Sequence, residues 1–282
     1  MKEKDRERIP GFLKNIYRFI IILFRYPLAR FRPLPHFIII GVQKGGTSTL
    51  FELLKQHPLI KTSVFKEVHY YDFQYQRGKN WYRSFFPLLT KNKNILYGEA
   101  SPYYCFHPLV PERIYKDNPN IKLILLLRDP VDRAYSHFQM EKRKGREKLA
   151  TFEEAVSKET ERLQKGYEEI TNEKKRYDHN HHVYSYLSRG RYDEQIKRWL
   201  QYFKREQLLV LKSEDFFASP HDSLKQIYKF LNIPVIFPKD LLAKNQGNYN
   251  PVESETIKRL RDYYQPHNEA LSQFLGEDFQ WS

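Results

Sequence analysis

Short apolar runs alternate with amphipathic segments along most of the chain. At 222–231, for example, apolar residues recur at helical spacing and form one stripe. Between such segments lie four short runs rich in β-branched and aliphatic residues, at 36–42, 95–99, 121–127 and 207–212. Strands that alternate with helices predict an α/β fold: one domain in which helices cover both faces of a central parallel sheet.

Local signals refine this picture in the second half of the chain. Thr151 and Glu154 have the spacing of a capping box, which predicts a helix over 151–165. The following segment, 168–184, is polar and lacks periodicity. It is predicted to be a long surface loop, of the kind that often recognises an acceptor.

The first 35 residues differ from the rest of the chain. They hold nine Lys/Arg and three acidic residues, a net charge of +6. Their apolar run, FIIILF at 19–24, is much shorter than the roughly 20 residues that span a bilayer, and no small-residue cleavage site follows it. We therefore expect a basic arm over 1–35 and a domain over 36–282. A helix packed on the domain is favoured for the arm, and contact with a membrane surface through residues 10–32 is the alternative.

Composition limits the function classes. The 282 residues are 40% hydrophobic and 16% aromatic, which excludes a disordered chain. The net charge of +14 indicates an anionic partner: nucleic acid, a membrane surface, an acidic polysaccharide or a phosphorylated small molecule. Cys105 is the single cysteine, so an intramolecular disulfide is impossible and a reducing compartment is favoured.

A glycine-bearing turn follows the first predicted strand, in IIIGVQKGGTSTL at 38–50. A nucleotide triphosphatase loop would have its lysine directly after the second glycine, whereas here the lysine comes two positions before it. Adjacent glycines at a helix N-terminus still suit an anion, although a turn without a ligand is the alternative. The candidate phosphate contacts are Lys44, Gly45, Gly46, Thr47 and Ser48.

A second candidate phosphate element is IKLILLLRDPVDRAYSHFQM at 121–140. Arg128 ends a buried strand, and Ser136 lies on the helix that begins near Pro130, so both side chains can converge on one anion. An acid at the strand end would suggest a magnesium nucleotide, but here the acid, Asp129, comes after the arginine. The pattern predicts phosphate binding without a metal. Surface ion pairs of Arg128 with Asp132 or of Arg133 with Asp129 are the alternative.

These two elements resemble a known family. QKGGTST resembles the 5′-phosphosulfate loop, and LLLRDPVDRAYS the 3′-phosphate motif, of sulfotransferases that use 3′-phosphoadenylyl sulfate (PAPS). The resemblance is to the heparan-sulfate type of carbohydrate sulfotransferase, in a bacterial form, and it covers 36–282. It extends to KEVHYYD (66–72), RGKNWYRSFFP (77–87), GEASPYY (98–104), RGRYDEQIKRWLQYF (189–203), LKSEDF (211–216) and LRDYYQPHNEALSQFLGEDFQW (260–281).

The resemblance implies a P-loop-like sulfotransferase fold and in-line sulfuryl transfer from PAPS, without a metal, to a hydroxyl or amine. It assigns Lys44 to the leaving phosphate and Glu67 to the acceptor proton as general base. His69, the third candidate catalytic residue, would point to the same side of an extended segment as Glu67. Arg128 and Ser136 would hold the 3′-phosphate. Without the resemblance, Glu67 would be a solvated charge beside Lys66 and His69 a core imidazole.

The resemblance also concerns the loop LLAKNQGNYNP at 241–251, where the family closes a glycine-containing loop over the nucleotide. The candidate contacts there are Lys244, Gln246, Gly247, Asn248, Tyr249 and Asn250. The family's more basic K-G-R form is absent. Ala100 stands where the 3-O-type heparan enzymes carry a lysine near the acceptor, so the sequence leaves the acceptor open: a glycan or another hydroxyl compound.

The remaining sequence features concern the location of the protein, metal binding and alternative functions. The lack of paired cysteines and of a spanning segment favours a cytoplasmic, bacterial-type enzyme. Histidines 179, 181 and 182 lack metal-site spacing, and the basic run at 142–148 is predicted to be a solvated helix end. A nucleic-acid-binding protein is the alternative function, weakened because no RNA motif or recognition helix occurs. A kinase is disfavoured by the displaced lysine.

Overall fold

The computed structural model describes residues 11–241 and 254–281. Its centre is a five-stranded parallel sheet in the order β2-β3-β1-β4-β5. The strands are β1 (Phe37–Gly41), β2 (Ile60–Thr62), β3 (Leu96–Ala100), β4 (Lys122–Leu127) and β5 (Leu208–Lys212). The four predicted strands and the parallel α/β fold are confirmed. The sequence analysis missed β2, because three residues are too few to form a recognisable apolar run.

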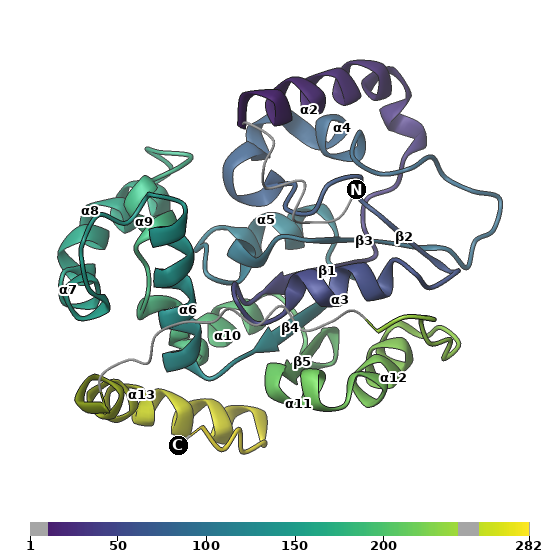
Figure 1. Cartoon of the computed structure of the whole chain (residues 1–282). Helices are drawn as coiled ribbons and strands as arrows, with labels where there is room; N and C mark the ends of the chain where they lie inside the picture. Colours follow the sequence, from purple (N-terminus) through teal and green to yellow (C-terminus); the bar gives the residue numbers. More distant parts are fainter. Residues whose placement is uncertain (1–10, 242–253, 282) are drawn as a thin grey trace.

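Helices cover both faces of this sheet (Figure 1). They are α2 (Gly11–Arg25), α3 (Thr47–Leu54), α4 (Gly78–Arg83), α5 (Val110–Asp117), α6 (Pro130–Arg143), α7 (Phe152–Ser157), α8 (Glu159–Thr171), α9 (His179–Val183), α10 (Tyr192–Leu200), α11 (Ser213–Ala218), α12 (Pro220–Leu231) and α13 (Ser254–Leu275). Short helical turns used below are η1 (Tyr26–Phe31), η2 (Tyr70–Gln74) and η5 (Ser188–Gly190).

The strands bury side chains on both faces because a helix layer covers each one. In β1, Ile38 and Ile40 pack with α4, α5 and α10, whereas Phe37 and Ile39 pack with α3 and α12. This alternation follows the period of two along a strand. The short apolar runs in the sequence therefore have a simple cause: helices cover both faces of the sheet.

Two predictions about the second half of the chain are corrected. The helix expected over 151–165 is two helices, α7 and α8, which meet at Lys158, although Thr151 and Glu154 do form the predicted capping box. The loop expected over 168–184 contains the end of α8 and all of α9. Asp178 caps α9 by accepting from the His181 amide (2.8 Å). Such a short polar helix depends on its cap and has no apolar stripe to signal it.

The basic run 142–148 is not simply a solvated helix end. α6 ends at Arg143, and beyond it Arg146 donates to Glu141 (2.7 Å). Glu147 is 3% exposed and pairs with Arg162 (2.8 Å) on α8. The two ion pairs hold the connection between α6 and α8 in place, because a buried carboxylate needs a partner.

The N-terminal helix α2 packs on the domain, which agrees with the favoured interpretation of the arm. Arg18 donates to the Glu67 carbonyl (3.2 Å), Tyr17 and Phe65 meet edge to face at 5.6 Å, and Ile22 packs against the core. Figure 1 shows α2 at the edge of the molecule beside α4. In the described residues, no helix combines the length and apolar character needed to cross a membrane.

Candidate active site

The loop between β1 and α3 is the centre of the candidate donor site. It is fixed to the neighbouring strand because the Val42 amide donates to the Leu126 carbonyl (2.9 Å). Within the loop the Gly45 amide donates to the Val42 carbonyl (3.0 Å), which makes the turn tight. α3 begins directly after it at Thr47, so the first-turn amides and the helix dipole favour an anion here.

Both loop glycines are required by close contacts. A Cβ on Gly45 would lie 2.6 Å from the Leu126 carbonyl oxygen, and one on Gly46 would lie 2.9 Å from the Phe217 ring. Gly46 and Lys44 also have φ angles of 96° and 74°, in the left-handed region. The sequence predicts this pair of glycines as anion contacts, whereas the packing partners that require glycine here lie far away along the chain.

Arg128 lies beside the phosphate loop. It follows β4, and its Nη1 donates to the Lys44 carbonyl (3.3 Å). Its Nη2 lies 3.3 Å from Asp132 Oδ2, which is one of the surface ion pairs considered from the sequence. The Tyr192 hydroxyl donates to the Arg128 carbonyl (2.8 Å) and fixes the backbone at this point. The guanidinium is therefore positioned at the same sheet edge as the loop.

Ser136 lies on α6 and is only 3% exposed. No hydrogen bond joins it to Arg128 in the described part of the chain, so their convergence on one phosphate stays a prediction. Asp129 caps α6 by accepting from the Val131 and Asp132 amides (2.8 and 2.9 Å). That carboxylate is therefore committed to the helix end. The other surface pair considered, Arg133 with Asp129, is replaced by a buried contact of Arg133 with the Tyr186 carbonyl.

The segment before η2 carries the candidate base. The Glu67 amide donates to the Ala100 carbonyl (2.8 Å), which attaches the segment to the end of β3. Glu67 and His69 have φ angles of 61° and 56°, in the left-handed region. The expectation of an extended segment is therefore wrong. Two backbone turns, and not the alternation of a strand, bring the two side chains together.

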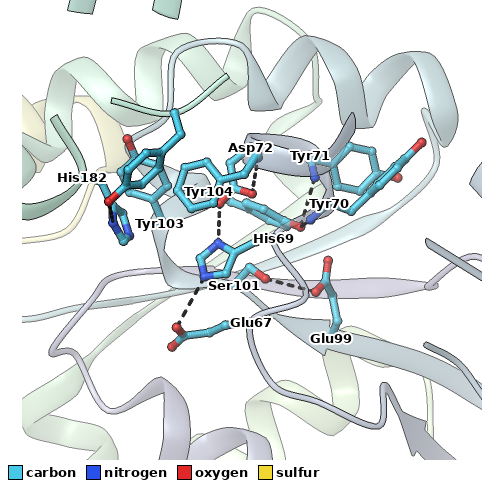
Figure 2. A network of polar contacts seen from close by, with 12 residues as sticks. Glu67, His69, Tyr70, Tyr71, Asp72, Glu99, Ser101, Tyr103, Tyr104 and His182 are labelled. Carbon is cyan, nitrogen blue, oxygen red and sulfur yellow. Dashed lines mark hydrogen bonds and ion pairs between the residues drawn. The ribbon is translucent and has the colours of Figure 1, made fainter. Parts of the chain in front are cut away.

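Glu67, His69 and Asp72 lie in a line (Figure 2). His69 Nδ1 lies 2.6 Å from Asp72 Oδ2, and its Nε2 lies 3.6 Å from Glu67 Oε2. On the other side, Lys66 Nζ lies 2.8 Å from Glu67 Oε1. The Asp72 side chain is fully buried, whereas the Glu67 side chain is 45% exposed. The carboxylate at the open end of the line is therefore the one that a substrate can reach.

The neighbouring charges set the protonation of this line. Burial opposes the charge on His69, but the carboxylates of Asp72 and Glu67 raise the pKa of His69 to about 10. Burial would raise the pKa of Glu67, but Lys66 and His69 outweigh it and hold that pKa well below its usual range. At neutral pH the site thus presents an ionised carboxylate between two cations.

Glu99 is a buried carboxyl group to which the sequence analysis gave no role. It lies on β3, is 0% exposed, and accepts from the Tyr82 hydroxyl (2.6 Å) and the Ser101 hydroxyl (3.1 Å). Figure 2 shows it near the Glu67 line. Burial raises the pKa of Glu99 to about 7 in spite of these hydrogen bonds. The only sequence signal was its place in the GEASPYY motif.

Arg189, also missed, links a distant turn to the phosphate loop. It is 3% exposed, and its guanidinium donates to Ser185 Oγ (2.7 Å), the His182 carbonyl (2.7 Å) and the Gln43 side-chain oxygen. Burial lowers the pKa of Arg189 to about 10, so it stays charged at neutral pH. The RGRYDEQ motif contains this residue, but nothing in the sequence indicated its partner in the loop.

The three histidines of α9 have separate surroundings. His181 is buried, and its Nδ1 lies 2.6 Å from the Tyr103 hydroxyl. Burial and the charge of Arg189 lower the pKa of His182 to about 2 and that of His181 to about 3, so both are neutral.

Within 11–241 and 254–281, no group of three or more His, Cys, Asp or Glu side chains is placed to hold a metal ion. Lys244 and residues 246–250 lie outside the described residues.

The strand order explains how these groups meet. β1 lies between β3 and β4, so the chain leaves β1 in the middle of the sheet and returns on both sides. In open parallel sheets, ligands bind outside the carboxyl ends of the strands at this switch point. The Lys44 loop follows β1, Arg128 follows β4, and Glu67 is attached to the end of β3. This arrangement suits an anionic donor over β1 and β4, with a proton acceptor on the β3 side.

Comparison with known proteins identifies the class. The sulfotransferase domain family matches residues 34–257, so the chain belongs to this family and is a sulfotransferase. The fold agrees with that of a crystallised sulfotransferase from Alicyclobacillus acidocaldarius: the TM-score is 0.72 at 28% identity, over 88% of this chain and 99% of that one.

Two relatives are similar over most of this chain. Heparan sulfate glucosamine 3-O-sulfotransferase 5 of Homo sapiens is 32% identical over 277 residues, covering 88% of this chain and 74% of that protein. The membrane-associated sulfotransferase kil1 of Dictyostelium discoideum is 28% identical over 313 residues, covering 88% of this chain and 66% of that protein. The chain thus spans about two thirds to three quarters of the length of these relatives.

Proposed function

We propose that this sulfotransferase takes its sulfuryl group from 3′-phosphoadenylyl sulfate and transfers it to a hydroxyl or amine of a carbohydrate, with Glu67 as general base. The observation that carries the proposal is the ionised, half-exposed Glu67 carboxylate attached to the end of β3, beside the strand that leads into the Lys44 loop. The first-turn amides of α3 and the charge of Lys44 suit the donor's phosphate.

The proposed step is in-line. The acceptor oxygen or nitrogen forms a bond to sulfur while the bond from sulfur to the bridging phosphate oxygen breaks, and that oxygen keeps the electron pair. Glu67 takes the acceptor proton, and Lys44 stabilises the charge that develops on the leaving phosphate. His69, held by Asp72, keeps the Glu67 carboxylate oriented toward the acceptor. The product nucleotide is 3′-phosphoadenosine 5′-phosphate (PAP).

The acceptor class rests on the relatives. The name of the human relative describes action on heparan sulfate glucosamine, which supports a glycan. Ala100 is fully buried at the end of β3 and brings no charge to the acceptor side. An anionic sugar would instead meet Lys66 beside the base. We therefore propose a carbohydrate acceptor without assigning it to heparan sulfate.

The test measures turnover and nucleotide affinity separately in the same variants. Glu67→Gln keeps the size of the side chain but cannot take a proton, so turnover of labelled donor should fall by roughly 10²–10⁴-fold. PAP affinity, measured by calorimetry, should stay nearly unchanged in this variant. Lys44→Ala should reduce both quantities. Full turnover by Glu67→Gln would assign the base to another residue, and His69 would be examined next.

We also propose that the enzyme makes peripheral contact with a membrane. The word "membrane-associated" in the name of the Dictyostelium relative supports this, and so does the basic N-terminal arm. A cytoplasmic location and the absence of a nucleic-acid partner remain predictions from the sequence.

A further inference from the structure

The helix α2 is oriented with Arg18 and Arg25 toward the protein and with several apolar side chains toward solvent. Arg18 donates to the Glu67 carbonyl (3.2 Å), and Arg25 donates to the Phe86 carbonyl. Ile22, between them on the same stripe, packs against the core. A surface helix of a globular protein normally shows the opposite orientation. Among residues 11–241 and 254–281, the inversion leaves the outer face of α2 without a partner.

The outer face is large and apolar. On α2 the exposed side chains fall at the spacing of one helical stripe, and η1 follows α2 directly. The Leu89 amide donates to the Phe31 carbonyl (3.0 Å), which places the loop after α4 against the end of η1. Its exposed members are Ile16 (46%), Phe19 (65%), Ile20 (44%), Leu23 (58%), Phe24 (75%), Phe31 (48%) and Leu89 (58%). We call this set the outer apolar face.

Cations lie next to members of the outer apolar face along the chain. No Asp or Glu occurs between residues 11 and 51, or between 73 and 98, the stretches that contain α2, η1, α4 and the loop after it. Arg30 is exposed and its guanidinium lies over the Phe31 ring at 4.7 Å, while Lys91 and Lys93 are exposed just beyond Leu89. An apolar surface with these cations beside it is complementary to an anionic lipid surface.

We infer that the outer apolar face docks on an anionic lipid bilayer, with Phe19, Leu23 and Phe24 inserted among the acyl chains and Arg30, Lys91 and Lys93 at the headgroups. This inference rests on the proposed membrane contact and is independent of the proposed chemistry. A second copy of the chain would be a poorer occupant, because two such faces would bring the same cations together. Exposed aromatic and aliphatic side chains on this scale otherwise mark an aggregation hazard.

The experiment is vesicle flotation of the full chain without donor or acceptor. Vesicles of phosphatidylcholine with phosphatidylglycerol are compared with vesicles of phosphatidylcholine alone. The wild type should float with the mixed vesicles and much less with the neutral ones. Lys91→Gln and Lys93→Gln should each weaken binding to the mixed vesicles about fivefold, and 1 M salt should weaken it further.

The apolar contribution is tested with Phe19→Ser and Phe24→Ser together. Binding should fall at least tenfold, while the thermal unfolding temperature should change little because both side chains are already exposed. Phe274→Ser, at an exposed position (42%) on α13, is the matched control and should bind as the wild type does. Glu67→Gln should also bind normally, so a failure of the chemistry can be told apart from a failure of docking.

Three outcomes would overturn the inference. The first is that no vesicles bind, and the second is equal binding to neutral and anionic vesicles. The third is a dimer in sedimentation equilibrium that the Phe19→Ser, Phe24→Ser protein no longer forms, which would assign the outer apolar face to a second copy of the chain.

Discussion

Asp72 is the residue on which the charge of His69 depends. It is completely buried, it lies 2.6 Å from the imidazole, and it is the leading cause of the high pKa of His69. With Asp72 ionised, the imidazolium persists to about pH 10 and faces Glu67 with an N–H group. We therefore expect His69 to position Glu67, whose side chain is 45% exposed against 19% for that of His69.

Asp72→Asn should move the alkaline limit of turnover. Without the carboxylate the pKa of His69 falls toward its ordinary value, so kcat/KM should begin to decline near neutral pH instead of near pH 10. PAP affinity should not follow this decline. The measurement is a pH profile of kcat/KM, with His69→Gln as the control that lacks the titrating group. An unchanged alkaline limit in Asp72→Asn would show that the imidazolium does not support turnover.

Glu99 should make the stability of the protein depend on pH. Its pKa in the folded protein, about 7, lies above the ordinary value of 4.5, so the folded state binds more protons between these two values. The free energy of unfolding therefore receives a contribution that is fully present below about pH 4.5 and is lost as the pH rises through about 7.

Glu99→Gln removes this titration and can still accept from the Tyr82 hydroxyl. The variant should gain stability relative to the wild type between pH 5 and pH 8, as measured by chemical denaturation at both values. Glu161→Gln, exposed on α8, should show no such gain and serves as the control. A constant difference between Glu99→Gln and the wild type would contradict the raised pKa.

At the scale of elements, the end of β4 is expected to set which nucleotide the site prefers. Arg128 should contact the 3′-phosphate through a charge-assisted hydrogen bond, for which roughly 1.5–3 kcal/mol is typical. PAP should therefore bind at least about tenfold more tightly than AMP. EDTA should not change this ratio, because Asp129, the acid at this strand end, already accepts two amides of α6.

Arg128→Gln should remove the preference for PAP over AMP, as measured by calorimetry. Arg191→Gln is a matched control, because Arg191 is exposed to a similar degree (34% against 29%) and is also paired with one carboxylate in the first turn of the helix that follows it. Equal affinities of the wild type for PAP and AMP would remove the basis for the donor proposal, and an EDTA-sensitive affinity would favour a metal-dependent kinase.

Elements with a repeated apolar pattern were predictable from the sequence, and elements held by single contacts were not. β1, β3, β4 and β5 are mainly apolar because helices cover both faces of the sheet, and Glu99 on β3 is the buried exception. β2 and α9 depend instead on one neighbouring strand and one capping aspartate. The break between α7 and α8 is likewise invisible in a continuous polar pattern.

The residues of the candidate site likewise fall into two groups, those that a sequence motif indicates and those that only a long-range contact brings in. Motifs of adjacent residues, such as the Lys44 loop and Glu67, could be found along the sequence. Arg189 could not, since its contact with Gln43 joins residues 146 positions apart. The left-handed turns at Glu67 and His69 were also missed, because the contacts that support them come from Ala100, Lys66 and Asp72 together.

For the whole molecule, the sheet sets the spacing of the site. Neighbouring strands lie about 4.8 Å apart, so β3 and β4, which flank β1, are separated by roughly 10 Å. The Glu67 segment attached to β3 and the guanidinium after β4 therefore lie on either side of the Lys44 loop, which follows β1. The separation of β3 and β4 is fixed by the backbone of the core and does not depend on flexible loops.

The hydrogen bond from Arg18 to the Glu67 carbonyl has a kinetic consequence. This hydrogen bond joins the segment that carries Glu67 to the inner side of α2. A helix with its side chains is about 10–12 Å across. With the outer apolar face on a bilayer, the loop that carries Glu67 would lie about one helix diameter from the lipid. An acceptor anchored in that bilayer would then reach the enzyme by lateral diffusion, so turnover would follow the surface density of the acceptor in the membrane and not its bulk concentration.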